Sequence, residues 1–417
     1  MSCFGLCGKE QKPKYDEFRV VYNKAAETVV IETQTSDHEV PQQQQQPHNT
    51  VALIDCGSSV IRAGFAGDES PLITIPTVVG KSTVDDVTKK VFGATALTSS
   101  NSYKLSYPVE RGFIKDWHDA EELLEHVIEK DLHIQPKMQQ LMLTEAPNNP
   151  PANQEKTAEM MFEKFQFSSF LLVPSTPMGM YGYGSTTGVI VESGAGQTHI
   201  VAVKDGDYIK DSYRHIPVGG NDLTKYMGQL LTQSGNARYF HGKRNEHEIL
   251  NEIKRIGCHI VLNYDEEVKN SQMNPDFITD HAILRDGTMI AMKTESYQVP
   301  ELLFKPELIG IHTGGIPQNI YDCIESCEPA LRAQLYGNIC LCGGNTMFPG
   351  IRDRLLWEVR TFAGHNVNVK INALPQRENL VFLGASLLGV CPKLRDNLIS
   401  YQEYREVGSQ IVHWKFF

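Results

Sequence analysis

Two stretches of the chain repeat one pattern of apolar and polar positions. Val51–Ala66 consists of an apolar run, the acid Asp55, a turn of glycine and serine, and a second largely apolar run. Gly188–Val203 has the same order, with Glu192 in the place of Asp55. Because short apolar runs bounded by turn residues are typical of buried strands, each stretch predicts a strand–acid–turn–strand hairpin. A repeat of this unit predicts two similar domains that face each other.

Helical patterns follow each of these hairpins. Apolar residues at helical spacing predict amphipathic helices over Trp117–Ile134, with Asp116 as N-cap, and over Asn153–Phe165. A third helix is predicted over Glu246–Val261, with one apolar stripe made of Ile249, Ile253, Ile256 and Ile260. Between the two predicted hairpins, the polar stretch Lys81–Ser102 predicts a small exposed subdomain with a surface loop.

Short apolar segments complete the pattern. Leu141–Leu143 and Asn338–Cys342 predict buried strands, and Asp286–Ile290 marks a further hairpin. The second of these strands leads into a glycine-rich turn, Gly343–Gly350, and then into a helix that ends at Arg360. Strands alternating with helices in this order predict an α/β fold.

The first 50 residues differ in kind from the rest. They end in the glutamine run Pro41–Pro47, which predicts a flexible linker, and we expect a disordered extension over 1–50. Phe18–Tyr22 and Thr28–Ile31 are short β-prone patches within it. Cys3 and Cys7, followed by lysines, are compatible with a weak lipid anchor, but incidental cysteines in a disordered tail are the favoured interpretation.

Composition narrows the class of protein. A chain of 417 residues is too long for one hydrophobic core, and 41% hydrophobic with 21% charged residues is typical of a soluble globular protein. The net charge of −11 argues against direct binding of nucleic acid. No apolar run approaches the ~20 residues that span a bilayer. Nine scattered cysteines without a zinc-site pattern predict free thiols in the cytoplasm.

The glycine turns carry the candidate chemistry. A turn rich in glycine and serine exposes consecutive backbone N–H groups, which attract phosphate. Arg62 lies just past the first turn, where a cation would meet a β-phosphate. Asp55 would hold Mg²⁺ through its waters, as proteins usually bind that ion. Paired glycines at Gly343 and Gly344, between a strand and a helix, predict a third contact to phosphate or nucleoside.

At these motifs the chain resembles the actin family, as a divergent actin-related protein. The resemblance covers about residues 51–417 and rests on VALIDCGSSVIRAGFAGDESP, YPVERGFIKDW, LMLTEAPNNPPANQEKTAEMMFEKF, GSTTGVIVESGAGQTHIV, GGNDLTKYM, CGGNTMFPGI and YQEYREVGSQIVHWKFF. Sugar kinases and Hsp70-type chaperones share the two-lobed ATPase fold but lack LTEAP and the IVH-x-K-x-F ending. The resemblance implies four subdomains in two lobes, with ATP or ADP and Mg²⁺ or Ca²⁺ in the cleft between them.

The implied boundaries place the first lobe at 51–182 plus 380–417, with a small subdomain at 77–107. The second lobe is 183–379, with a small subdomain at 219–311. A cleft for actin-binding partners is implied at Tyr181, Thr186 and Leu388. The implied nucleotide-binding residues are Asp55, Gly57, Ser58, Ser59, Arg62, Glu192, Gly194, Gly196, Gly220, Lys254, Gly343, Gly344, Asn345, Met347 and Phe348, with His199 in the second loop.

Several residues depart from the family pattern at positions that the resemblance assigns to ATP hydrolysis and to nucleoside binding. Arg62 replaces a lysine, Ser175 replaces the glutamine that positions the attacking water, and Glu192 and Ala195 replace aspartates of the second loop. Since hydrolysis in this class depends on positioning and charge stabilisation, these changes predict very slow or absent hydrolysis. Three adenosine contacts are also changed, to Asn251, Arg255 and Glu378, two of them with reversed charge.

Positions that actins use for polymer contacts are changed as well. The loop between Gly80 and Gly93 is shorter, the expected tyrosines are Lys204 and Asp207, and an acidic surface cluster has become Glu328–Ala330 with Gln334. The histidine that actins usually modify is Arg111. We therefore expect a cytoplasmic, cytoskeletal scaffolding protein whose partners are cytoskeletal proteins, actin-binding proteins or other actins. The alternatives are a divergent polymerising ATPase and a nuclear actin-related subunit of a chromatin-remodelling complex, although the long insertions usual in the latter are not evident.

Overall fold

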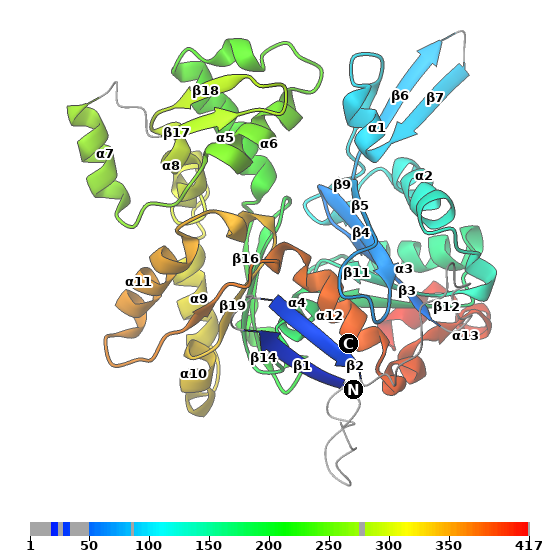
Figure 1. Cartoon of the computed structure of the whole chain (residues 1–417). Coiled ribbons are helices and arrows are strands. Elements are labelled where there is room, and N and C mark those ends of the chain that lie inside the picture. Colours follow the sequence, from blue (N-terminus) through cyan, green and yellow to red (C-terminus); the bar gives the residue numbers. More distant parts are fainter. Residues whose placement is uncertain (1–17, 24–27, 34–49, 85–86, 275–279, 416–417) are drawn as a thin grey trace.

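Two six-stranded sheets form the centres of the two lobes. A computed structural model of the chain describes residues 18–23, 28–33, 50–84, 87–274 and 280–415. The first-lobe sheet has the order β21-β12-β11-β3-β4-β5 (Figure 1). Its strands are β3 (Val51–Cys56), β4 (Val60–Phe65), β5 (Ile73–Pro76), β11 (Gln140–Glu145), β12 (Ser169–Pro174) and β21 (Ile399–Ser400).

The second-lobe sheet repeats this arrangement. Its strands are β13 (Gly188–Ser193), β14 (Thr198–Lys204), β15 (Asp207–Tyr208), β16 (Arg214–Ile216), β19 (Ile339–Cys342) and β20 (Ile371–Asn372). In the first sheet β3 pairs with β4 antiparallel and with β11 parallel, and in the second β13 pairs with β14 antiparallel and with β19 parallel. Asp55 and Glu192 each occupy the fifth position of their strand. The predicted duplication and the α/β fold are therefore confirmed.

Helices cover the outer faces of both sheets. The first lobe has α2 (Trp117–His126) and α3 (Pro151–Glu159), each continuing into one π-helical turn, to Asp131 and Lys164, and α13 (Tyr401–Val407). Asp116 caps α2 as predicted, because its side chain accepts a hydrogen bond from the Asp119 N–H at 3.0 Å. In the second lobe the sheet is covered by α9 (Ile316–Glu325), α10 (Pro329–Tyr336) and α11 (Ile351–Ala363). A separate group beyond the sheet consists of α5 (Gly220–Gln233), α6 (Glu246–Gly257), α7 (Tyr264–Met273) and α8 (Glu295–Glu301), with the predicted hairpin formed by β17 (Asp280–Ile283) and β18 (Met289–Met292) (Figure 1).

A middle layer of two helices joins the sheets. Helices α4 (Ser175–Gly182) and α12 (Leu380–Gly389) pack against each other between the lobes (Figure 1). One hydrophobic core includes residues of both helices and of both sheets, among them Leu53, Ile190 and Phe382. Separate cores fill the two lobes on either side of it. The lobes therefore share a packed hinge region on one side of the molecule.

The contact between α4 and α12 depends on a close approach at Gly384. A methyl group at this position would lie 1.7 Å from the Met178 carbonyl oxygen. We expect Gly384→Ala to lower the free energy of unfolding by about 1–3 kcal/mol, the usual range for overpacking a core. Chemical denaturation measures this loss. The control is Gly337→Ala, where φ is −72° and the added methyl group would come no closer than 3.4 Å to a heavy atom. A loss at Gly384 no larger than in the control would contradict the prediction.

Three local expectations need correction. Within the stretch predicted to be a small exposed subdomain with a surface loop, much of the chain is strand: β6 (Val79–Val84) and β7 (Val87–Phe92) pair, and β8 (Lys104–Ser106) joins them into a sheet beside α1 (Gly93–Thr98). Two lysines that are cross-strand neighbours in this hairpin face α2: Lys81 Nζ lies 2.5 Å from the Asp119 carboxylate, and Lys90 pairs with Glu122. The polar composition that suggested a loop supplies these ion pairs instead.

The third predicted helix is shorter than expected. It ends at Gly257, because Cys258 takes up an extended conformation, and Ile256 is 47% exposed rather than on the core face. The buried face consists of Leu250, Ile253, Lys254 and Gly257. Ile260 is buried, but it lies beyond the end of the helix. The stripe predicted from isoleucine spacing was therefore wrong at Ile256.

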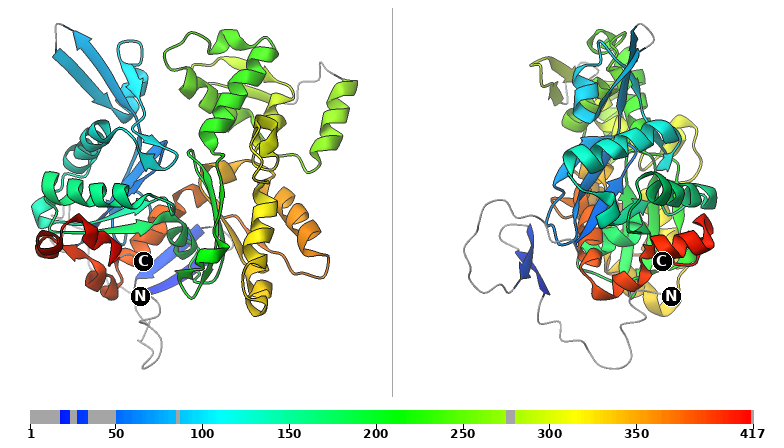
Figure 2. Two further views of the ribbon diagram at one scale, coloured as in Figure 1. Left: turned by 180° about the vertical axis from the view of Figure 1, so that it is seen from behind. Right: turned by 90° about the vertical axis from the view of Figure 1, so that its right-hand side faces the viewer.

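The N-terminal extension contains one paired element. The β-prone patches form an antiparallel hairpin of β1 (Phe18–Asn23) and β2 (Thr28–Thr33), so the expectation of disorder does not hold for these two strands. The hairpin is a sheet of its own and lies to one side of the body (Figure 2). The linker 41–47 and the cysteines at positions 3 and 7 lie outside the described residues.

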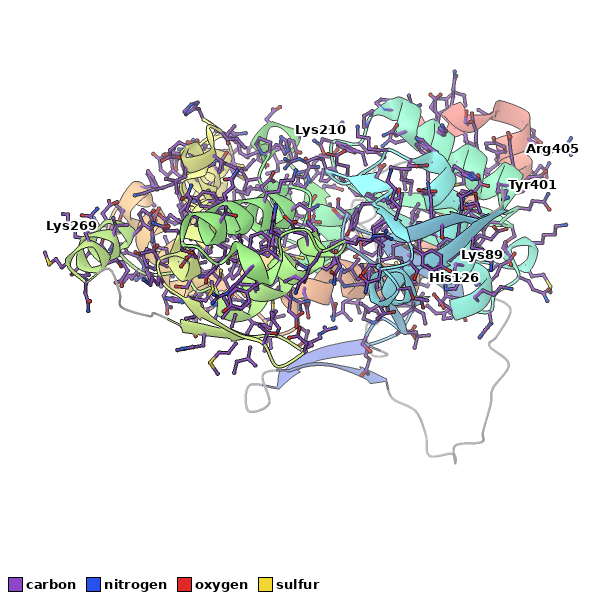
Figure 3. All side chains as sticks on the ribbon, turned by 90° about the horizontal axis from the view of Figure 1, so that it is seen from above. Lys89, His126, Lys210, Lys269, Tyr401 and Arg405 are labelled. Carbon is purple, nitrogen blue, oxygen red and sulfur yellow. The ribbon has the colours of Figure 1, made fainter. Side chains whose placement is uncertain are left out.

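The outer parts of the two lobes are well separated. In the view from above, Lys89 on β7 and Lys269 on α7 mark opposite sides of the molecule (Figure 3). None of the helices in the described part of the chain is long and apolar enough to cross a membrane. The exact lobe boundaries at 182/183 and 379/380 stay predictions.

Candidate functional site

A cavity of about 360 Å³ lies between the lobes, where the two repeated hairpins turn. Its volume falls within the ~300–1,000 Å³ range of small-molecule pockets. Every residue that the sequence predicted for nucleotide binding lines it, together with Ser175, Ala195 and His199. Asn251, Arg255 and Glu378 line it as well. The structure thus brings together residues from both halves of the chain.

The two hairpin turns present unpaired backbone donors. Within the described residues, the N–H groups of Ser58 and Ser59 in the first turn, and of Ala195 and Gly196 in the second, have no hydrogen-bond partner. Consecutive backbone N–H groups exposed on a concave turn attract anions, so four free donors on one cavity suit an anionic ligand. The turns themselves are held tightly, by Gly57 N to Val60 O at 3.1 Å and Gly194 N to Gln197 O at 3.2 Å.

Asp55 is held in place from both sides. The Thr144 hydroxyl donates a hydrogen bond to Asp55 Oδ1 at 2.6 Å, and Arg62 Nη1 lies 3.6 Å from Asp55 Oδ2. Arg62 in turn donates from Nε to Asn379 Oδ1 at 2.8 Å. The Arg62 guanidinium is therefore held in one position beside the first turn. A lysine ammonium, on a flexible stem, would be more mobile there.

Glu192 occupies a drier environment. The Ser175 hydroxyl donates a hydrogen bond to Glu192 Oε2 at 2.8 Å. Desolvation, reinforced by the nearby negative charge of Asp55, raises the pKa of Glu192 to about 7. The Ser175 hydroxyl is thus engaged with a carboxyl group of the protein.

His199 is neutral. Burial, together with the neighbouring His215, lowers its pKa to about 3. Its Nδ1 lies 2.8 Å from the Tyr213 hydroxyl, and its ring stacks on His215 at 5.6 Å between centroids. A ring with this pKa carries no positive charge at neutral pH, so it contributes no cation to the cavity.

The far end of the cavity is organised by Lys254 and Asn345. Lys254 Nζ donates to the Gly220 carbonyl at 2.8 Å and to the Thr224 hydroxyl at 2.9 Å. Burial lowers its pKa to about 8. Asn345 Nδ2 donates to the Gly194 carbonyl at 2.7 Å, which ties the third glycine turn to the second. These side chains shape the cavity wall and position the turns.

The protein side chains of this site do not by themselves enclose a divalent cation. Among the described residues, no group of three His, Cys, Asp or Glu side chains could hold a metal ion. Mg²⁺ commonly keeps several waters and takes one or two carboxylates together with ligand phosphates. Asp55, beside the free N–H groups, suits this role.

Sequence reasoning missed several residues of the site. Thr144 could have been found, because parallel strands β3 and β11 end at the same edge and place Thr144 opposite Asp55. Asn379 and Tyr213 carry no comparable signal, since they reach the site from distant parts of the chain. The predicted partner cleft stays a prediction. There Tyr181 and Leu388 are buried in the middle core, and Thr186 is half-buried.

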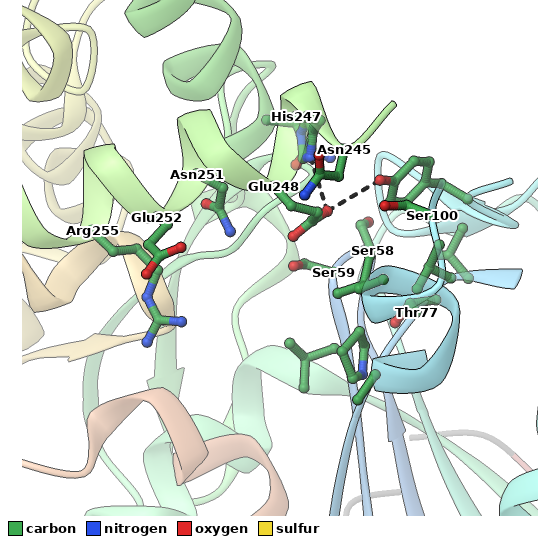
Figure 4. Close-up of a pocket in the computed structure, with 18 of the residues that line it drawn as sticks. Ser58, Ser59, Thr77, Ser100, Asn245, His247, Glu248, Asn251, Glu252 and Arg255 are labelled. Carbon is green, nitrogen blue, oxygen red and sulfur yellow. Dashed lines mark hydrogen bonds and ion pairs between the residues drawn. The ribbon is translucent and has the colours of Figure 1, made fainter. Parts of the chain in front are cut away.

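The cavity opens into a wider cleft of about 1,080 Å³ between the small parts of the lobes (Figure 4). Residues of α6, including His247, Glu248 and Arg255, line one side, and Ser58, Ser59 and Thr77 line the other. The Tyr107 hydroxyl donates a hydrogen bond to Glu248 Oε1 at 3.1 Å across the opening.

These features match the result of a comparison with protein families. The family model described as Actin matches residues 46–417, which is nearly the entire chain. The match includes both sheets, the middle layer and every residue that lines the cavity. With its duplicated lobes around one cleft, the chain therefore belongs to the actin family.

Proposed function

We propose that the chain binds ATP or ADP, with Mg²⁺ or Ca²⁺, in the cavity between the lobes. The observation that carries this proposal is the set of four free N–H groups on two opposed turns, beside Asp55 and Arg62. Oriented backbone donors and a fixed cation are complementary to a polyphosphate. Nucleotide binding is also general in the family to which the chain belongs.

Each part of the ligand has a corresponding wall. Ser58, Ser59, Ala195 and Gly196 would donate to phosphate oxygens, and Asp55 would accept hydrogen bonds from the waters of the cation. Met347 and Phe348 give the third turn an apolar surface for the nucleoside. Because Arg255 and Glu378 reverse the charges expected there, recognition of the nucleoside differs from that of conventional actins.

We further propose that hydrolysis is very slow or absent. A residue that orients the attacking water is a main component of phosphoryl-transfer catalysis, and removing one well-placed polar group costs ~10²–10³ in rate. Here Ser175 is short and hydrogen-bonded to Glu192, Ala195 has no polar group, and His199 is uncharged. A retained nucleotide would then stabilise the closed lobes, and the protein would act as a structural, cytoskeletal scaffold in the cytoplasm.

Two measurements on the full-length chain test this proposal. Denaturing the purified protein and analysing the released small molecules should yield ATP or ADP, and added ATP with Mg²⁺ should raise the melting temperature. Phosphate release and pelleting should show little turnover and few filaments. Rapid release with filament formation would instead support a polymerising ATPase. A protein without nucleotide that does not respond to ATP would reject the proposal.

Asp55 provides the sharpest variant for nucleotide binding. Asp55→Asn keeps the shape but removes the charge that would hold the hydrated cation, so we expect at least ~10-fold weaker binding of Mg·ATP, as for a lost bond to a charged group. Isothermal titration measures the affinity. The matched control is Asp286→Asn, a substitution on an exposed hairpin outside the cavity. This variant should bind Mg·ATP with the same affinity as the unchanged protein. Equal affinities for all three proteins would show that Asp55 has no part in binding.

A further inference from the structure

One arginine connects the two lobes beside the phosphate-binding turns. Arg111 lies in the tight turn between β9 (Val109–Glu110) and β10 (Phe113–Ile114) of the first lobe. Its Nη1 and Nη2 atoms lie 2.6 and 2.7 Å from the two carboxylate oxygens of Asp222, on the first turn of α5 in the second lobe. This is the bidentate geometry that makes arginine–carboxylate pairs strong and directional.

The same guanidinium reaches the second hairpin turn directly. Arg111 Nη1 also donates to the carbonyl oxygens of Gly196 and Pro217, each at 2.9 Å. Asp222 is itself fixed, because it accepts a hydrogen bond from Gly219 N at 2.9 Å. The first turn of α5 is bonded to the second hairpin turn, through Gly220 N to Gly194 O at 3.0 Å. A displacement of Arg111 would therefore also move the second hairpin turn, which is one of the two proposed phosphate-binding turns.

The other hairpin turn is attached to the next residue. Gly112 N donates a hydrogen bond to Ser58 Oγ at 2.8 Å. The turns pack without spare room, since a methyl group at Gly196 would lie 2.7 Å from Ser58 Oγ and 2.9 Å from Arg111 Cα. Arg111 itself has φ of +53°, a conformation that a side-chain-bearing residue keeps only where its surroundings hold it. Residues 111 and 112 thus bridge both turns.

The position of this bridge determines its mechanical effect. The lobes share the α4–α12 layer, and the turn between β9 and β10 lies on the side away from it (Figure 1). A contact far from a hinge opposes opening more effectively than one close to it. Two single hydrogen bonds also span the lobes at the outer opening. Tyr107 donates to Glu248 at 3.1 Å from a neutral hydroxyl, and Arg244 Nη1 donates to the Asn101 carbonyl oxygen at 2.6 Å between exposed groups, but neither has the bidentate carboxylate pairing of Arg111 (Figure 4).

We propose that Arg111 is a positioning residue that couples nucleotide occupancy to closure of the lobes. The arginine pair and a bound polyphosphate both stabilise the arrangement in which the two turns face each other. By linkage each strengthens the other, so the pair slows nucleotide release and the nucleotide tightens the pair. The nucleotide half of this inference depends on the function proposed above, whereas the closure half does not.

The release rate of a fluorescent ATP analogue tests the nucleotide half. On the full-length chain, Arg111→Gln should release the analogue at least ~10-fold faster, because breaking a hydrogen-bonded charge pair acts mainly on dissociation. Arg111→Lys keeps the charge but loses the planar fork, so it should give an intermediate rate and also serves if the glutamine variant does not fold. Tyr107→Phe should change the rate less than twofold.

A matched arginine provides the control. Arg332 on α10 also contacts one carboxylate, that of Glu325, and two carbonyl groups, those of Glu325 and Cys327, but all of these lie within the second lobe. Arg332→Gln should therefore lower stability without changing release. If Arg332→Gln and Arg111→Gln accelerate release equally, the effect is general destabilisation and the proposal fails.

Hydrogen exchange of the nucleotide-free protein tests the closure half separately. Arg111→Gln should speed exchange at least ~10-fold at the hydrogen-bonded amides of the two turns, Gly57 and Gly194, and at the start of α5, and Arg332→Gln should not. If the unchanged protein does not bind the analogue but exchange rises as expected, the proposed function fails and the lobe contact stands. The inference is overturned if hydrogen exchange in the Arg111 variants is the same as in the unchanged protein. It is also overturned if exchange becomes faster but the release rate of the analogue does not change.

Discussion

Replacing Glu301 with alanine should lower the free energy of unfolding of the second lobe by about 3–5 kcal/mol, the usual cost of leaving a buried charge without its partner. Glu301 on α8 is 1% exposed, and its Oε1 lies 3.0 Å from Nη2 of Arg354 on α11, which is 4% exposed. Arg354 is also held by the Val261 carbonyl oxygen at 2.7 Å and lies over the Phe304 ring. With Glu301 removed, the guanidinium stays in the interior, and its only remaining carboxylate partner among the described residues is the more exposed Glu358.

The measurement follows the fluorescence of Trp357, three residues after Arg354 on the same helix, during urea denaturation. Trp117 and Trp414 are replaced by phenylalanine in every protein compared, so that the signal reports the second lobe. Glu358→Gln is the matched control, because Glu358 also contacts Arg354 but is more exposed, and it should cost less than Glu301→Ala. Glu301→Leu combined with Arg354→Met should regain most of the loss, since an apolar pair of similar volume often replaces a buried ion pair without cost. A loss below about 1 kcal/mol for Glu301→Ala would show that the pair is not electrostatically critical.

Replacing Glu192 with glutamine should change how stability depends on pH. Glu192 has a folded-state pKa raised from 4.5 to about 7, so between these values the folded protein binds more protons at this site than the unfolded chain. By linkage, this group contributes stability that is present below pH 4.5 and is lost as the pH rises through 7. Glutamine accepts the same hydrogen bond from Ser175 without ionising. The stability of Glu192→Gln relative to the unchanged protein should therefore rise by about 3 kcal/mol between pH 4.5 and pH 8, at ~1.4 kcal/mol per pKa unit.

Denaturation of nucleotide-free protein at several pH values measures this difference. His199, whose pKa is lowered, acts in the opposite direction below pH 6.5, but it is common to both proteins and cancels. Ser175→Ala removes a hydrogen bond that favours the ionised carboxylate, so it should move the pH midpoint of the effect upward. A constant difference between Glu192→Gln and the unchanged protein across this pH range would contradict the environment assigned to Glu192.

The candidate site was largely readable from the sequence because its framework is local. Each strand–acid–glycine turn–strand unit lies within one short stretch of the chain. The two units, Val51–Ala66 and Gly188–Val203, share the same order of residue types. The residues missed were those whose partners are distant. Arg62 and Asn379 are 317 positions apart, and Arg111 and Asp222 are 111 apart, so no local pattern reports that they meet.

The errors have a similar cause. Lys81 and Lys90 look like loop residues in isolation, yet α2 offers them Asp119 and Glu122, and the hairpin forms between them. Ile256 looks like a core residue, but α6 turns its Leu250 and Lys254 inward instead. In both cases the packing partner, not the intrinsic preference of the residue, decided the outcome.

By itself, the sequence determined the duplicated hairpins, the α/β order of elements and the glycine turns, because strand and turn preferences depend on neighbouring residues. Its motifs also carried the resemblance to the actin family. Only the tertiary structure decided which charges are paired, which are buried and which bridge the lobes. The physical reason is that desolvation and ion pairing depend on atoms brought within a few ångströms by folding, from parts of the chain that are unrelated in sequence.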